Sequence, residues 1–193
     1  MVGVDERRLV ERARRGDPEA FAQLYRLHVQ AIFRYTFHRV NDVHLAEDLT
    51  SDVFARALKS IAGYADQGKP FIAWLYRIAH ARVVDHYRRS DRRPVEGDLD
   101  AEPIPVTADL DQGILRRQAA GALRAALVRL TDEQQQVVIL RFIEGYPVET
   151  VAQIMGKNAN AIKALQHRAL RALAGHLRRA GFDVETILAG LSS

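Results

Sequence analysis

The stretch VETVAQIMGKNANAIKALQHRALRAL, residues 148–173, contains two helix patterns separated by a tight turn. Gly156 suits the left-handed conformation that ends a helix, and Asn158 is a typical N-cap for the helix that follows. At about 100° per residue, four apolar side chains of the second helix fall on one arc. They are Ile162, Leu165, Ala169 and Leu173. A short helix, a turn with glycine and a longer helix together predict a helix-turn-helix.

The opposite arc of the second helix carries small, amide and basic side chains. When a helix-turn-helix binds DNA, its second helix lies in the major groove, where cations contact phosphates. An amide such as that of Asn160 can pair with adenine. The residues that we expect at this DNA interface are Lys157, Asn158, Asn160, Lys163, Ala164, His167, Arg168 and Arg171. Two alternatives stay open: a solvated face, and a helix-turn-helix that contacts only protein.

The remaining periodic segments are also helical in pattern, which predicts an all-α protein. Asp17 and Pro18 indicate the start of a helix that ends near Val40, a second helix ends near Gly63, and a third opens at Pro70. A further helix is expected at about 114–130. Thr131 and Gln134 then form a capping box for a helix that Gly145 ends, and Pro147 starts the first helix of the helix-turn-helix.

An acidic segment separates two helical regions. It holds Pro103 and Pro105, lacks apolar periodicity and, from 94 to 113, carries six acidic residues and no Lys or Arg. Removing its charge of −6 from the net +4 leaves +10 on the remainder, which suits nucleic acid as a partner. We expect an acidic flexible linker at 94–114 between two small domains at 17–93 and 115–181. Residues 1–16 would form an N-terminal extension and 182–193 a C-terminal tail.

The composition excludes several classes of site. The chain has no cysteine, which rules out disulfides, thiolate metal sites and a cysteine nucleophile. Its histidines form no pair at three- or four-residue spacing, so we expect no metal. Because no acid–base or nucleophile constellation stands out, we expect no cofactor and no enzymatic activity. The start of the chain lacks an apolar signal region, and no run of about 18 apolar residues occurs. A cytoplasmic protein without membrane insertion is therefore expected.

The first domain offers two unlike surfaces. Over residues 64–93, aromatic side chains alternate with Lys and Arg, which suits unpaired DNA because bases stack on rings while cations contact phosphates. Trp74 is equally consistent with a core position, since it shares a helical face with Phe71 and Ile78. The other surface is the acidic face of HLAEDLTSDVFARAL, residues 44–58, which DNA would avoid and a protein partner could use. A merely solvated acidic face is the alternative.

Three motifs, in order, resemble a bacterial RNA polymerase sigma factor of the extracytoplasmic-function group. They are NDVHLAEDLTSDVFARAL (41–58), FIAWLYRIAHARVVDHYRR (71–89) and LTDEQQQVVILRFIEGYPVETVAQIMGKNANAIKALQHRALRAL (130–173). The resemblance implies a transcription initiation factor that directs core RNA polymerase to promoters, recognises the -35 and -10 elements and promotes DNA opening. The implied partners are core polymerase, through its clamp coiled coil and flap, promoter DNA, and an anti-sigma factor or other inhibitory regulator. The acidic linker would enter the polymerase channel toward the RNA exit.

The resemblance also implies roles for single residues, with the helix-turn-helix reading the -35 element. Residues implied to bind and open the -10 element are Tyr64, Lys69, Trp74, Arg77, His80, Ala81, Arg88 and Arg89. Residues implied to bind core polymerase are Glu47, Asp48, Leu49, Asp52 and Phe54.

The chain departs from the family pattern at several of these motifs. Ser51 and Asp52 replace a Gln-Glu pair, and Ala81 replaces an Asn. Leu165 stands where an arginine is common, and Pro147 where a Ser cap is common. The promoter sequence read by relatives therefore does not carry over to this chain.

Two other functions compete with this interpretation. One is a stand-alone helix-turn-helix regulator whose N-terminal domain senses a ligand or dimerises, and the other is a helical adaptor between proteins. A sensor needs a pocket and a dimeric repressor needs an apolar seam. The first domain instead has a basic-aromatic helix beside an acidic one, so the sequence favours the sigma-factor interpretation.

Overall fold

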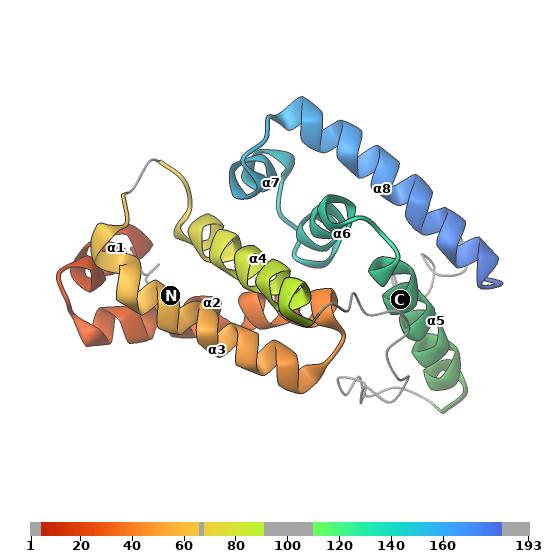
Figure 1. Ribbon diagram of the computed structural model, residues 1–193, viewed down its shortest axis with the longest axis horizontal. Helices are drawn as coiled ribbons and strands as arrows, with labels where there is room; N and C mark the ends of the chain where they lie inside the picture. The colour runs from red at the N-terminus through yellow and green to blue at the C-terminus, as the bar shows by residue number, and fades with distance from the viewer. Residues whose placement is uncertain (1–4, 66–67, 91–109, 183–193) are drawn as a thin grey trace.

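The computed structural model describes residues 5–65, 68–90 and 110–182, and its regular elements are all helical (Figure 1). The first part of the chain forms α1 (Glu6–Arg14), α2 (Pro18–Val40), α3 (Val43–Ser60), the short 3-10 turn η1 (Ile61–Gly63) and α4 (Phe71–Ser90). The second part forms α5 (Leu110–Val128), α6 (Asp132–Val138), the π-helical turn η2 (Ile139–Ile143), α7 (Val148–Met155) and α8 (Ala159–Arg179). The predicted all-α class is confirmed.

Helix ends follow local chemistry at the predicted places. Asp17 accepts from the N–H groups of Glu19 and Ala20 at the start of α2, and Asn41 ends that helix in the left-handed conformation. Thr131 and Gln134 form the predicted capping box at α6. Each cap satisfies backbone donors that the first turn of a helix leaves without an intrahelical partner. The starts of α2 and α6 are therefore set by a capping side chain that bonds to a backbone N–H two or three residues further along the chain.

The first domain is built on α2, α3 and α4, and it also includes α1. Leu9, Val10 and Ala13 of α1 are buried in the same apolar cluster as Leu24 and Ile32 of α2. Residues 1–16 were expected to form an extension outside the domain. Instead, the apolar stripe of α1 packs against α2 and η1, so the domain begins at least as early as Glu6.

Helix α5 starts at Leu110, inside the range 94–114 in which a linker was expected. The rest of that range lies outside the described residues. The helix after the capping box also differs from the expectation, since it changes to a π turn at Ile139–Ile143. There the N–H of Glu144 donates to the carbonyl of Ile139 at 2.9 Å, one residue further back than in an α-helix.

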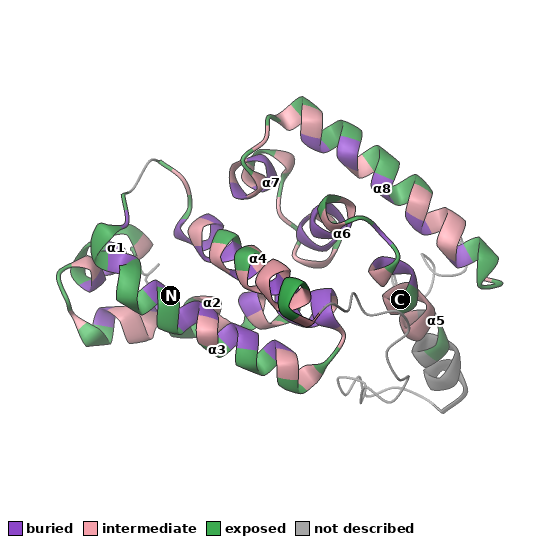
Figure 2. Cartoon of the chain, viewed as in Figure 1, coloured by how far each residue is buried: buried purple, intermediate pink, exposed green. Residues whose placement is uncertain are grey.

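The two domains pack against each other, an arrangement that the sequence did not indicate. Helix α7 lies against α4, and α2 contacts both α5 and η2 (Figure 1). Buried residues line the sides on which neighbouring helices face each other, whereas α8 keeps an exposed outer side (Figure 2). The apolar cluster runs through both domains and includes Tyr76 of α4 and Val151 of α7.

None of the helices in the described ranges is long and apolar enough to span a membrane.

Candidate nucleic-acid and polymerase interfaces

Helix α8 separates a packing face from an outward face as its periodicity predicts. Ile162, Leu165 and Ala169 are buried, with Ile162 fully inaccessible to solvent. Burying a side chain of that size stabilises the folded state by about 1.5–3 kcal/mol. Because rotating the helix would expose these side chains, their burial fixes the orientation of α8 about its axis. The predicted contact residues on the other side are exposed, namely Asn160, Lys163, Ala164, His167, Arg168 and Arg171. These residues are therefore all accessible to a partner.

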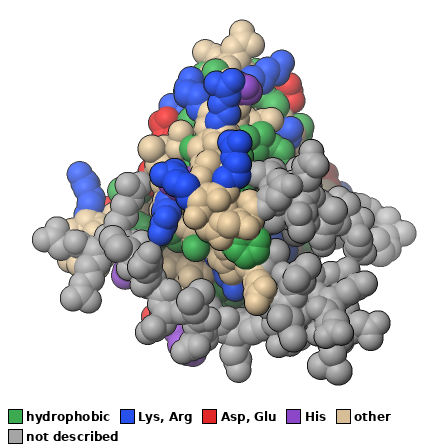
Figure 3. All heavy atoms as spheres, turned by 90° about the vertical axis from the view of Figure 1, so that its right-hand side faces the viewer, with side chains coloured by type: hydrophobic (Ala, Val, Ile, Leu, Met, Phe, Trp, Pro, Cys, Tyr) green, Lys and Arg blue, Asp and Glu red, His purple; other side chains and the backbone are tan. Residues whose placement is uncertain are grey.

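Two predicted members of this surface already have partners within the protein. Asn158 accepts from the N–H of Ala161 at 2.8 Å and caps α8. Lys157 forms an ion pair with Glu133 at 2.8 Å. Figure 3 views the side of the molecule that includes the end of α8, and Lys and Arg side chains follow one another along the upper part of that face. The outward side of the helix-turn-helix therefore has the charge that a phosphate backbone attracts.

In the first domain, the loop before α4 and the first turns of that helix form an aromatic cluster. The Trp74 indole lies 4.9 Å from the Tyr64 ring and 5.4 Å from the Phe71 ring, measured between centroids. Tyr64 and Phe71 are buried, while Trp74 is half-buried. The two roles considered for Trp74 are thus compatible, since the indole packs against the core cluster and is still partly exposed to solvent.

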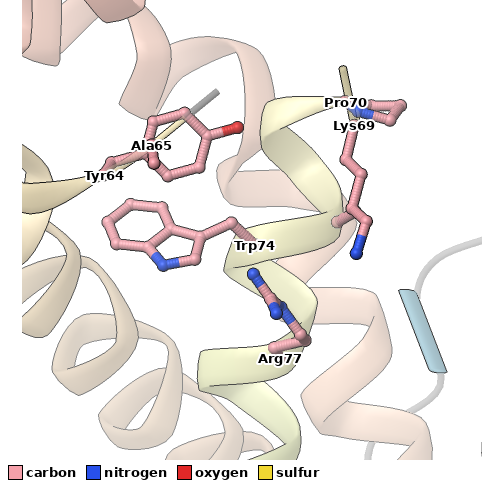
Figure 4. Close-up of a pocket in the computed structure, with 7 residues that line it drawn as sticks. Tyr64, Ala65, Lys69, Pro70, Trp74 and Arg77 are labelled. Carbon is pink, nitrogen blue, oxygen red and sulfur yellow. The ribbon is translucent and has the colours of Figure 1, made fainter. Parts of the chain in front are cut away.

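The same cluster encloses a small cavity next to two cations (Figure 4). Tyr64, Lys69, Trp74 and Arg77 line it, with Tyr64 contributed by the loop and Trp74 and Arg77 by α4. Its volume of about 10 Å³ holds roughly one water molecule. A wider hollow of about 440 Å³ adjoins it between this loop and the first turn of α1. A cavity of this size is too small to hold a nucleobase.

The other residues predicted to bind the -10 element spread along α4. Arg77, Ala81, Arg88 and Arg89 are exposed. His80 is half-buried. Its Nε2 lies 3.6 Å from a carboxylate oxygen of Asp132, which belongs to the second domain. Burial lowers the pKa of His80 below its ordinary value, although the Asp132 charge acts in the opposite direction. His80 therefore lies at the contact with the second domain.

The predicted polymerase-binding residues lie on α3 but differ in accessibility. Glu47 and Asp48 are exposed, whereas Leu49 and Phe54 are buried. Asp52 pairs with Arg82 of α4 and with Arg56 on its own helix. Because the Arg82 side chain is only 12% exposed, Asp52 also joins α3 to α4. No local pattern of α3 indicates this structural role of Asp52, because the partner arginine lies thirty residues away in the sequence.

In the described part of the chain, no group of three or more His, Asp or Glu side chains is placed to hold a metal ion.

Comparisons with known proteins match two separate parts of the chain. The family description "Sigma-70 region 2" matches residues 24–93, and "Sigma-70, region 4" matches residues 120–173. The first match covers the acidic α3 and the basic-aromatic α4, and the second covers the helix-turn-helix. The surfaces of α3 and α4 therefore lie in one region of the family, and the outward face of α8 lies in the other.

Individual relatives are named as sigma factors. The chain is 42% identical over 169 residues to the ECF RNA polymerase sigma factor BldN of Streptomyces coelicolor, covering 86% of this chain and 63% of that protein. It is 33% identical over 176 residues to the ECF RNA polymerase sigma factor ShbA of Streptomyces griseus, covering 86% of this chain and 91% of that protein. The chain thus spans somewhat less than two thirds of BldN and nearly all of ShbA.

A solved structure shares the fold. The sigma factor RpoE from Bartonella quintana, solved with the anti-sigma factor NepR, superposes with a TM-score of 0.64 at 23% identity, covering 82% of this chain and 96% of that one. Two conserved regions in the expected order, relatives above 30% identity and a shared helical fold lead to one conclusion. The chain belongs to the extracytoplasmic-function (ECF) group of the sigma-70 family, the proteins that direct RNA polymerase to promoters.

Proposed function

We propose that this protein binds core RNA polymerase and directs it to promoters whose -35 element contacts α8 and whose -10 element contacts α4 and the loop before it. The observation that carries the proposal is the outward face of α8. Asn160, Lys163 and Arg171 are exposed there, while the opposite face of the same helix is buried. A helix held in this way can enter a major groove without disturbing its own domain.

The first domain would supply the remaining contacts. Arg77, Arg88 and Arg89 hold the DNA backbone, and a base that leaves the stack is received beside Trp74. The acidic face of α3, with Glu47 and Asp48 at its centre, docks on the clamp coiled coil of the polymerase. An exposed acidic face suits a protein partner better than DNA, which would be repelled by it.

Several further properties follow from the same proposal. The protein acts in the cytoplasm as a non-enzymatic factor without cofactor or metal, because the catalytic steps belong to the polymerase. Its activity is controlled by an inhibitory partner, as suggested by the anti-sigma factor present in the solved relative. The acidic linker passes through the polymerase channel toward the RNA exit.

Transcription with purified core polymerase on genomic fragments tests the proposal, with start sites mapped from the RNA. Transcripts that depend on the protein and share two upstream elements are expected. Lys163→Ala combined with Arg171→Ala should reduce them, whereas Arg178→Ala, at the far end of α8, should not. DNA binding without any effect on polymerase would support the stand-alone regulator instead.

A further inference from the structure

Helix α1 lies outside the part of the chain that matches the family, since that match begins at residue 24. The helix is nevertheless fixed in place. Its Arg12 donates from Nε to the Asp17 carboxylate at 2.8 Å, which ties α1 to the start of α2. Three of its apolar residues are buried in the core of the first domain, namely Leu9, Val10 and Ala13. A helix held on two sides can present a functional side chain at a defined position.

The first turn of α1 and the loop before α4 form the hollow of about 440 Å³. Pockets of roughly 300–1,000 Å³ take up ligands larger than a nucleobase. The apolar part of the lining comes from Val10, Tyr64, Pro70 and Phe71. Charged groups are contributed by Asp5, Glu6, Arg7 and Lys69. An apolar surface with a few charged groups beside it is the composition of a ligand site.

The charges around the hollow favour an anion. Asp5 caps α1, and the Glu6 carboxylate lies 3.3 Å from Nε2 of His28, so both acids already have partners within the protein. Within the described ranges, Arg7 and Lys69 form no ion pair, and Arg7 is exposed. The arginines further along α1 are paired, namely Arg12, Arg14 and Arg15. The two cations of the hollow are therefore the charges left for a ligand.

The position of the hollow indicates which anion it receives. It shares Tyr64, Lys69 and Pro70 with the small cavity beside Trp74 (Figure 4). That cavity cannot hold a base, whereas the hollow next to it has room for one. Single-stranded DNA needs an apolar surface for a base and cations for its phosphates, and the hollow offers both. An unpaired strand that follows the loop away from α4 therefore reaches the hollow next.

We propose that the hollow between α1 and the loop before α4 binds one unpaired nucleotide of the opened promoter strand, adjacent to the base beside Trp74. The base lies on the apolar wall of the hollow, and Arg7 and Lys69 hold a phosphate. Helix α1 is thereby part of the DNA-binding surface, a role that no motif of the sequence indicated. The inference rests on the proposed function, which brings the -10 element to α4 and the loop before it.

Arg7→Ala and Arg8→Ala form a matched pair, because both arginines are exposed near the start of α1 and only Arg7 lines the hollow. Each full-length variant is combined with core polymerase and bound to a promoter fork whose -10 strand is unpaired, over a range of salt concentrations. Arg7→Ala should weaken binding about fivefold and reduce the salt slope by about 0.7, the value for one phosphate of a single strand. Arg8→Ala should bind as the wild type does, and both variants should keep the wild-type melting temperature.

Abasic sites, introduced one at a time into the unpaired strand, identify the nucleotide that enters the hollow. At its position the missing base should weaken binding of the wild-type complex about fivefold or more, as the loss of one stacked base does. In Arg7→Ala, the penalty at that position should fall to about twofold or less, because a base and a phosphate of the same nucleotide are coupled. Penalties at the other positions should persist in this variant.

The outcomes decide the two proposals separately. If Arg7→Ala binds the fork as Arg8→Ala does at every salt concentration, the hollow does not hold the strand. If deoxynucleoside monophosphates bind the protein alone through Arg7 and no position of the fork shows a penalty that depends on Arg7, the hollow is a site for free nucleotides and its assignment to DNA is wrong. If the wild-type complex binds a scrambled fork as well as the promoter fork, the proposed function fails. The abasic scan still tests the hollow in that case, because stacking and phosphate contacts do not depend on sequence.

Discussion

Asn160 and Lys163 leave the same exposed side of α8 but should contact DNA in different ways. Lys163→Ala should weaken promoter binding by a similar factor on every -35 sequence and reduce the salt slope by about one phosphate contact, because an ammonium group meets the backbone. Asn160→Ala should relax preference at one base pair by about 1–3 kcal/mol, because an amide pairs with a base edge. Binding of the polymerase–protein complex to single-base variants of the promoter measures both.

Arg178→Ala is the control, since this residue is exposed near the end of α8 and away from the turn. If both Asn160→Ala and Lys163→Ala bind every -35 variant as the wild type does, the outward face of α8 is not the reading face.

His38, near the end of α2, makes stability depend on pH. Burial lowers its pKa from 6.5 to about 4, with the nearby charges of Arg124 and Arg34 acting in the same direction. Above pH 6.5 the folded and unfolded chains are both neutral at this group. As the pH falls toward 4, the unfolded chain binds a proton that the folded protein excludes, so the free energy of unfolding decreases.

The expected loss from His38 is about 1.4 kcal/mol between pH 7.5 and pH 5.5, measured by urea unfolding. His38→Gln should remove that part of the pH dependence. The control His44→Gln should retain it, because the His44 side chain is 97% exposed. An identical pH dependence in all three proteins would mean that His38 is accessible to protons in the folded state.

At the scale of the element, the start of α8 depends on one side chain. Asn158 caps the helix through its bond to the N–H of Ala161. Asn158→Ala should lower the free energy of unfolding by about 1 kcal/mol, because the first turn then exposes an unsatisfied donor. Thermal unfolding without DNA measures this, with Asn160→Ala as the exposed control two residues on. Equal melting temperatures would show that the cap contributes nothing, and would leave DNA contact as the role of Asn158.

At the scale of the whole molecule, two acidic residues of α3 can separate docking on polymerase from stability of the fold. Asp48 is exposed, so Asp48→Arg should reduce co-purification with core polymerase at least about tenfold while the melting temperature stays unchanged. Asp52→Arg should lower binding and also stability, by about 1–3 kcal/mol, because it leaves Arg82 without this partner.

Glu19→Arg, which changes an exposed acid on α2, is the matched control for charge alone. If Asp48→Arg binds polymerase as well as this control does, the acidic face of α3 is not the docking surface.

Local interactions explain why much of the fold could be predicted. Asp17, Thr131 and Asn158 were recognised as caps because each bonds to an N–H two or three residues ahead. The buried arc of α8 was recognised because residues three and four apart lie on one side of a helix. The predicted outward residues of that helix are exposed for the same reason. By itself, the sequence determined most of the helices, the caps of α2, α6 and α8, and the two faces of α8. It did not indicate α1, the start of α5 at Leu110 or the π turn η2.

Only the tertiary structure decided how the two domains meet. Arg39 pairs with Asp132, 93 residues away, and Arg34 pairs with Glu144, 110 residues away. In the sequence, Asp132 is an ordinary acid in the first turn of a helix, and Arg34 is one arginine among many. The energy of such a pair depends on how far water is excluded and on where the partner atoms lie. Both are set by the packing of α2 and α4 against α6, η2 and α7, which no local pattern encodes.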